Sequence, residues 1–229
     1  MFEAIIPLRS KSRGLKNKNI LLFKNRVNLV NYTLNKLIKI KEIKKIYILT
    51  DSILYKKKII QNKKIDINYL RKKQYSNSKS KIDDLINDFL KNYNRDINNK
   101  KFLLFQVTSP NLGKEEIIKT INFINKKKIS SLMHVTKILE NPYEVIETNK
   151  KKWSFLMKKR LVNRQSYPKK FMFITGSLYF FTRNFFLKNQ EMINSKTYPY
   201  KVDRINFVDI DDLFTFELSK QISSLKIRD

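Results

Sequence analysis

A run of basic and hydroxyl side chains follows the first apolar segment of the chain, from residue 9 to residue 19. Its candidate donors to phosphate are backbone N–H groups around Gly14, two serine hydroxyls, and the side chains of Arg9, Arg13, Lys16 and Lys18. Several charge-assisted donors on one loop suit a polyphosphate. The spacing matches neither a Walker A loop nor a GxGxxG motif, and an ordinary basic surface loop fits the lysine-rich composition equally well.

Two carboxylates, Asp209 and Asp211, stand near the end of the chain with Ile210 between them. In an extended strand, residues two apart project on one face, so both carboxylates would point the same way while Ile210 turns into the core. With no cysteine and one histidine in the chain, oxygen atoms are the realistic metal ligands. One or two carboxylates often hold Mg²⁺ together with substrate phosphates. The competing interpretation is that Asp211 or Asp212 caps the following helix, and the spacing alone favours this cap.

Polar residues end two other apolar segments. Thr50-Asp51-Ser52 ends one of them and is interpreted first as a helix cap, and Gln106, Thr108 and Ser109 end another. The carboxyl ends of parallel strands meet at one edge of a sheet, so these groups would line a common crevice. His134 and the aromatic residues between 171 and 186 lie in apolar patterns and are expected to be structural.

The elements that must position these residues alternate between apolar β-rich segments and helical patterns. This alternation predicts an α/β fold with a mostly parallel, twisted sheet and helices on both faces. The expected strands are residues 2–7, 46–49, about 67–70, 102–105, 131–135, 178–181 and 206–210. The main expected helices are 29–38, 82–90, 114–123 and 212–225. No linker or repeat marks a boundary, so residues 1–229 are expected to form one domain.

The chain carries a net charge of +29, which is typical of proteins that bind nucleic acid or anionic membranes. Its lysines are spread along the whole chain with abundant isoleucine and asparagine, so we interpret much of the charge as the codon bias of an AT-rich genome. No apolar run reaches the length of a signal peptide or membrane span. We therefore expect a cytoplasmic protein that binds neither nucleic acid nor a membrane. Tight binding to random duplex DNA at physiological salt would contradict this expectation.

In order along the chain, these segments resemble the acylneuraminate cytidylyltransferase family, which includes the CMP-sialic acid synthetases and their legionaminate and pseudaminate relatives. Residues 5–20 are similar to the family's opening, an Ile-Ile-Pro-Ala-Arg run that ends in Lys-Asn-Ile. Shorter matches follow in the family's order and approximate spacing, at Leu49-Thr-Asp-Ser52, Gln106-Val-Thr-Ser-Pro110, Arg164-Gln165, Gly176-Ser-Leu-Tyr179 and Val208-Asp-Ile-Asp211. The resemblance spans nearly the whole chain.

The resemblance implies a fold like that of the nucleotide-diphospho-sugar transferases, with Mg²⁺ as cofactor and CTP and an acidic sugar as ligands. By this resemblance, the triphosphate would contact Arg9, Ser12, Arg13, Lys18 and Asn19, and the cytosine would contact Arg71 and Ser80. The sugar acid would contact Gln106, Ser109 and Arg164, and the metal would be bound by Asp209 and Asp211. Arg9, Lys18 and Asp211 are the implied catalytic residues, and Asp211 is the nearest candidate for a base. The family is dimeric, and a small β-like dimerisation arm would fall at about residues 135–168.

The implied reaction transfers CMP from CTP to a nine-carbon 2-keto sugar acid and releases pyrophosphate. The chain departs from the family at Val107, Leu112 and Thr175, where proline, arginine and asparagine are common, while its phosphate- and metal-binding segments are kept. An eight-carbon acid such as Kdo is the nearer alternative substrate. A basic nucleic-acid-binding protein is the alternative of a different class.

Overall fold

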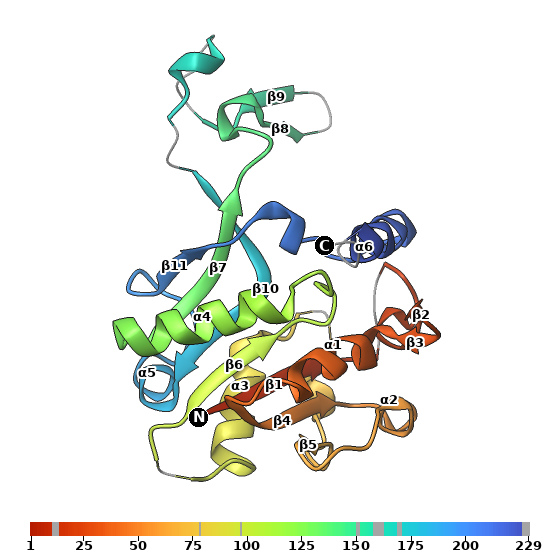
Figure 1. Ribbon diagram of the computed structural model, residues 1–229. Helices are drawn as coiled ribbons and strands as arrows, with labels where there is room; N and C mark the ends of the chain where they lie inside the picture. The colour runs from red at the N-terminus through yellow and green to blue at the C-terminus, as the bar shows by residue number, and fades with distance from the viewer. Residues whose placement is uncertain are drawn as a thin grey trace.

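The structure, a computed structural model, describes residues 1–10, 14–77, 79–96, 98–149, 152–157, 163–168 and 171–225 (Figure 1). Its strands are β1 (Phe2–Leu8), β2 (Leu22–Lys24), β3 (Val27–Asn28), β4 (Ile43–Thr50), β5 (Ile65–Asp66), β6 (Lys101–Phe105), β7 (Ser131–Lys137), β8 (Ile146–Asn149), β9 (Lys152–Phe155), β10 (Met172–Thr182) and β11 (Tyr198–Lys201). Its α-helices are α1 (Leu29–Ile38), α2 (Ile53–Lys58), α3 (Ile82–Asn92), α4 (Lys114–Lys127), α5 (Arg183–Asn189) and α6 (Leu213–Leu225).

Seven strands form the central sheet, in the order β11-β7-β10-β6-β1-β4-β5. β1 pairs in parallel with β4 and β6, β4 pairs in parallel with β5, and β7 pairs in parallel with β11. β10 runs antiparallel to both of its neighbours, β6 and β7. The predicted mostly parallel sheet is therefore confirmed, and β1, β4 and β6 all present their carboxyl ends at the same edge.

Helices cover both faces of this sheet (Figure 1). On β1, Ala4 and Ile6 pack into one core with residues of α1 and α4, whereas Ile5 packs into a second core with residues of α3 and α5. All three of these side chains are fully buried. A strand covered on both faces gains from apolar residues at every position, which explains the unbroken apolar runs of the sequence.

The expected strand at residues 206–210 is wrong. The strand in this part of the chain is β11, which lies at the sheet edge beside β7. After β11 the chain leaves the sheet, and the Ile210 N–H donates to the Thr108 carbonyl oxygen at 2.8 Å. Ile210 is fully buried against Phe23, Leu29 and Phe216, so its apolar character comes from this small third core and not from a strand ladder.

A hairpin of β8 and β9 projects beyond the ends of β7 and β10, at the top of Figure 1. It lies within the stretch 135–168 where the sequence predicted an arm. Its apolar side chains are unusually open for their type, with Trp153 at 62% and Ile146 at 47% exposure. The partner that the prediction assigned to this arm stays a prediction.

His134 of β7 is structural, as its apolar surroundings predicted. It is fully buried, and its ring nitrogens lie 3.0 Å from the Thr120 hydroxyl and 3.3 Å from the Ser177 hydroxyl. Burial lowers the pKa of His134 to about 3. The ring of the folded protein is therefore neutral at any pH well above that value, including the range in which a solvated histidine takes up a proton.

This depressed pKa predicts a pH-dependent stability. Below pH 6.5 the unfolded chain takes up a proton that folded His134 rejects, so the free energy of unfolding falls as the pH falls. One proton corresponds to a slope of about 1.4 kcal/mol per pH unit. Urea unfolding between pH 5 and pH 7 should show this extra slope for the wild type and its loss in His134→Gln. Equal slopes for the two proteins would contradict the assignment.

Candidate active site

A cavity of about 370 Å³ opens at the carboxyl ends of β1 and β6. We call it the strand-end cavity, and its lining residues are Pro7, Arg9, Lys18, Asn19, Arg71, Asn77, Ser80, Ile82, Gln106, Val107, Thr108, Asp209 and Asp211. Ligands of open α/β sheets bind in this position because loops from neighbouring strands meet there. Eight residues proposed from the sequence thus share one cavity: Arg9, Lys18, Asn19, Arg71, Ser80, Gln106, Asp209 and Asp211.

The basic loop after β1, which carries Arg9 and Lys18, contacts the acidic segment 209–211 through Lys18. The Lys18 ammonium group lies 3.0 Å from the Asp211 carboxylate and donates at 2.5 Å to the Ile210 carbonyl oxygen. Behind it, the buried Asn19 side chain donates to the Arg9 carbonyl oxygen at 3.2 Å. Residues 192 positions apart in the sequence are therefore joined directly, and the two ends of the chain form one wall of the cavity.

The loop is also fixed to the end of β4. Asp51 accepts hydrogen bonds from both the backbone N–H and the hydroxyl of Ser10, at 2.9 and 3.0 Å. Ser52 caps α2, because its hydroxyl accepts from the Tyr55 N–H at 3.2 Å. The cap expected in this segment is confirmed for Ser52. Asp51 does not cap the helix but holds the basic loop, a role that the sequence could not reveal.

Asp209 and Asp211 differ sharply in environment. The Asp211 side chain is 77% exposed, whereas one oxygen of Asp209 is buried and has no hydrogen-bond partner among the described residues. Burial raises the pKa of Asp209, a hydrogen bond with Thr108 opposes this, and the nearby Asp211 carboxylate adds to it. Asp212 accepts from the Thr215 N–H at 2.8 Å and so takes the capping role that Asp211 could have had.

An oxygen without a partner beside a second carboxylate fits a divalent cation. Mg²⁺ needs only one or two protein carboxylates when phosphates and water complete its coordination shell. No group of three or more acidic or histidine side chains that could hold a metal ion occurs among the described residues. Asp209 and Asp211 are the residues that would hold such an ion.

The opposite wall comes from the segment between β5 and α3, with Arg71, Asn77 and Ser80. Arg71 is 7% exposed, and its guanidinium donates to the Tyr75 carbonyl oxygen from two nitrogens. Burial lowers the pKa of Arg71, Asp51 opposes this effect, and Arg9 adds to it. Asn77 was not predicted from the sequence, because an asparagine in a polar segment carries no signal of its own.

A smaller cavity of about 120 Å³ adjoins the first and shares Ile82 and Gln106 with it. Asp83 and Tyr179 also line it. Burial raises the pKa of the Tyr179 hydroxyl, and the carboxylates of Asp209 and Asp83 raise it further. Gly176 has a φ of +73°, and a side-chain carbon there would lie 3.7 Å from the Tyr179 hydroxyl and 3.8 Å from the Gln106 amide oxygen. The site therefore has a second compartment beside the first.

The remaining predicted residues are not placed in the strand-end cavity. Ser109 is 5% exposed and lines a separate cavity of about 10 Å³. Ser12 and Arg13 lie outside the described residues, and so does the side chain of Arg164. Their proposed contacts stay predictions.

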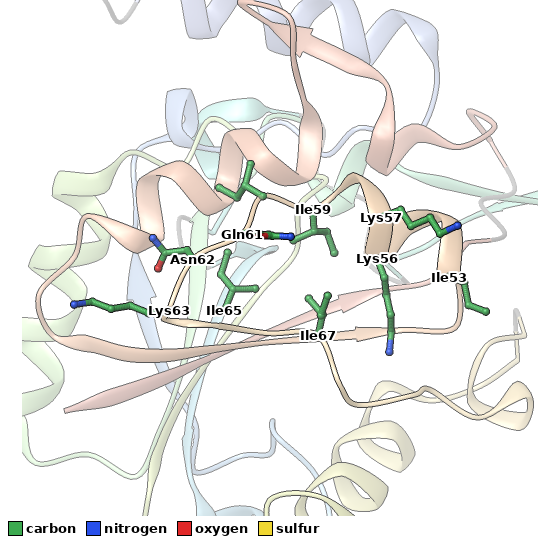
Figure 2. Close-up of a pocket in the computed structure, with 10 residues that line it drawn as sticks. Ile53, Lys56, Lys57, Ile59, Gln61, Asn62, Lys63, Ile65 and Ile67 are labelled. Carbon is green, nitrogen blue, oxygen red and sulfur yellow. The ribbon is translucent and has the colours of Figure 1, made fainter.

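A larger hollow of about 740 Å³ lies away from these residues, along the edge strand β5 (Figure 2). Figure 2 shows Ile59, Ile65 and Ile67 gathered at its centre, with Lys56 and Lys63 toward its two ends. Its described lining contains no carboxylate or histidine. The volume of a hollow does not by itself indicate a reactive site, and we propose no catalytic or binding role for this one.

Known structures share this arrangement of elements. A CMP:2-keto-3-deoxy-manno-octonic acid synthetase solved with CTP superposes with a TM-score of 0.69 and 10% identity, covering 99% of this chain and all of the other. The 4-diphosphocytidyl-2C-methyl-D-erythritol synthase of Anaerococcus prevotii gives 0.64 and 13%, covering 97% and 96%. Fold and site geometry together define an α/β protein of the nucleotidyltransferase fold.

A model of the cytidylyltransferase family matches residues 3–209, and the chain belongs to that family. Among the relatives that are similar in sequence are two proteins named N-acylneuraminate cytidylyltransferase. The Streptococcus agalactiae protein is 25% identical over 90% of this chain and 49% of its own length, and the Escherichia coli protein is 27% identical over 98% and 52%. The chain thus spans about half the length of these relatives. No helix among the described residues is both long and apolar enough to cross a membrane.

Proposed function

We propose that the chain is a cytidylyltransferase that moves CMP from CTP onto a nine-carbon 2-keto sugar acid of the N-acylneuraminate type and releases pyrophosphate. The convergence of Arg9 and Lys18 with Asp209 and Asp211 on one cavity carries the proposal. Cations can receive the triphosphate there while the carboxylates face the same space. Family membership and the names of the two relatives favour this reaction over nucleic-acid binding.

In the proposed reaction, the anomeric hydroxyl oxygen bonds to the α-phosphorus of CTP, the bond from that phosphorus to the bridging oxygen breaks, and pyrophosphate leaves with its electron pair. Arg9 and Lys18 would offset the charge on the departing phosphates, and Asp211 is the proposed acceptor of the hydroxyl proton. Bound Mg²⁺ would neutralise part of the triphosphate charge. No covalent enzyme intermediate is needed, so positioning and charge compensation would supply most of the rate.

The adjoining small cavity is the proposed place of part of the sugar acid. Gln106 lies on the boundary of the two cavities, so it can contact an acceptor while the nucleotide fills the larger one. Asp83 and Tyr179 offer polar groups to sugar hydroxyls there. We also propose that the β8–β9 hairpin joins two copies of the chain, because Trp153 and Ile146 leave apolar area uncovered on it.

Direct identification of the product tests the proposed reaction. The purified chain is incubated with CTP, Mg²⁺ and a panel of nine-carbon and eight-carbon 2-keto sugar acids, and CMP-linked products are identified by mass. We expect a CMP-linked nine-carbon product and an equal amount of pyrophosphate. A product formed only with the eight-carbon acid would show that the proposed substrate is wrong, and the absence of any CMP-linked product would refute the proposed reaction.

A further inference from the structure

One buried carboxylate outside the cavity holds three other side chains. Asp88 of α3 accepts from the Tyr69 hydroxyl at 2.7 Å, from the Lys72 ammonium group at 2.6 Å and from the Asn92 amide at 2.9 Å. Asp88 is 6% exposed, and none of these four residues lines the strand-end cavity. The cluster therefore does not serve the cavity by direct contact.

Two of the partners flank Arg71, which does line the cavity. Tyr69 and Lys72 stand on either side of it in the chain, and both are attached to the same carboxylate of α3. Between them, the Arg71 N–H donates to the Thr50 carbonyl oxygen at 3.1 Å. The backbone at Arg71 is thus held from β4 on one side and from α3 on the other, and its guanidinium is held by the Tyr75 carbonyl oxygen.

The rest of this cavity wall is built on the same anchored segment. The Ser76 hydroxyl donates to the Lys72 carbonyl oxygen at 3.0 Å, and the Ser80 hydroxyl donates to the Gln74 carbonyl oxygen at 2.7 Å. Asn77 also donates to the Gln74 carbonyl oxygen, at 2.9 Å. The wall is a chain of local hydrogen bonds, and Asp88 ties it to a helix of the main body through Tyr69 and Lys72.

Fold stability alone does not call for a carboxylate at this place. Moving a charge from water to a buried position costs free energy, and an apolar side chain of similar size at this position of α3 would be buried without that cost. Burial raises the pKa of Asp88, but hydrogen bonds from Lys72, Tyr69 and Asn92 outweigh it and leave the pKa below its ordinary value. The group is charged at neutral pH and acts as a directional anchor.

We propose that Asp88 is a positioning residue for nucleotide binding, acting through Tyr69 and Lys72 on the wall that carries Arg71. The proposal rests on the proposed function, because it assumes that CTP occupies the strand-end cavity. Its consequence is specific. Loosening the anchor should weaken the binding of CTP, while the group-transfer step, which depends on the opposite wall, should keep its rate.

The chain contains a closely matched control at the other end of the sheet. Glu3 of β1 lies 2.9 Å from the Lys100 ammonium group, accepts from the Asn94 amide at 3.0 Å and is hydrogen-bonded to the Tyr47 hydroxyl. Like Asp88, it is a carboxylate with lysine, asparagine and tyrosine partners. It lies near the amino end of β1, whereas the cavity is at the carboxyl end. Glu3→Gln therefore disturbs a similar cluster far from the proposed nucleotide.

The test compares Asp88→Asn, Lys72→Gln, Lys72→Arg and Glu3→Gln with the wild type. CTP binding is measured by titration calorimetry, kcat and KM by pyrophosphate release, and folding by thermal unfolding. Asp88→Asn should raise the Kd and KM for CTP about tenfold, because small displacements of positioning groups are costly, while kcat stays near the wild-type value. Lys72→Gln should act in the same direction, and Lys72→Arg should bind CTP like the wild type. Glu3→Gln should lower the unfolding temperature and leave the Kd unchanged.

Three results would overturn the inference, and they are distinguishable. If the wild type binds CTP and Asp88→Asn and Lys72→Gln bind it equally well, the cluster is structural only. The cluster is likewise structural only if Glu3→Gln weakens CTP binding as much as Asp88→Asn does, since the effect would then report lost stability. If the wild type itself binds no CTP, the proposed function fails and the inference fails with it. Lys72 is 54% exposed, so its variants remain informative even where Asp88→Asn folds poorly.

Discussion

Replacing Asp209 by asparagine is expected to reduce turnover with CTP and Mg²⁺ by about 10²-fold or more, on the scale seen when one preorganised charge-stabilising group is removed. Asp209 presents to the cavity a carboxylate with one oxygen lacking any protein partner among the described residues, and asparagine cannot supply the negative charge that a divalent cation requires. Pyrophosphate release at saturating CTP measures the effect, and a calorimetric titration with Mg²⁺ and CTP measures the loss of metal-dependent binding.

Two controls separate this loss from unfolding. Folding raises the pKa of Asp209, so its ionised form costs stability at neutral pH. Asp209→Asn should therefore keep or slightly raise the unfolding temperature of the metal-free protein. Asp212→Ala removes a neighbouring carboxylate that caps α6 and lines no part of the cavity, so it should lower stability and keep turnover. Full activity in Asp209→Asn would refute the metal assignment.

The sheet was predictable because strands buried on both faces must be apolar at successive positions. Leu103 and Leu104 of β6 are both fully buried and pack into opposite cores, so no polar residue could interrupt the run. Residues 206–210 produced a similar apolar pattern without a strand. There, Ile210 fills a small core beside Phe216, and a single backbone hydrogen bond to Thr108 replaces the ladder. Burial determines the pattern, and the sequence alone does not reveal which kind of burial is responsible.

The candidate site was predictable to the extent that its residues follow strands directly. Arg9 follows β1 and Gln106 follows β6, and their place at the carboxyl edge comes from topology. Asp51 and Asp88 could not be predicted in this way, because each acts through partners that are distant in the sequence. Asp51 accepts hydrogen bonds from a residue 41 positions away, and Asp88 accepts one from a residue 16 positions away. An isolated aspartate gives no indication of such partners, so these supporting residues require the folded structure.

Gly14→Ala is expected to reduce turnover by about 10²-fold, because displacement of positioned groups by roughly 1 Å has effects of this size. A side-chain carbon at Gly14 would lie 2.0 Å from the Asp211 carbonyl oxygen, far inside any permitted contact. The obstacle is backbone and cannot rotate away, so the basic loop and the acidic segment must separate. That movement also strains the hydrogen bond from the Leu15 N–H to the same oxygen, now 3.1 Å, and the Lys18 contact with Ile210.

Gly113→Ala is the matched control for this substitution. Gly113 precedes α4, and a side-chain carbon there meets no atom within 4 Å, so the same chemical change should leave turnover at the wild-type level. Pyrophosphate release from both variants, with thermal unfolding to verify their folding, measures the contrast. Normal activity in a folded Gly14→Ala protein would mean that the approach of the basic loop to Asp211 is not needed for the reaction. In that case Lys18 and Asp211 would have to act without the close contact between the two segments that carry them.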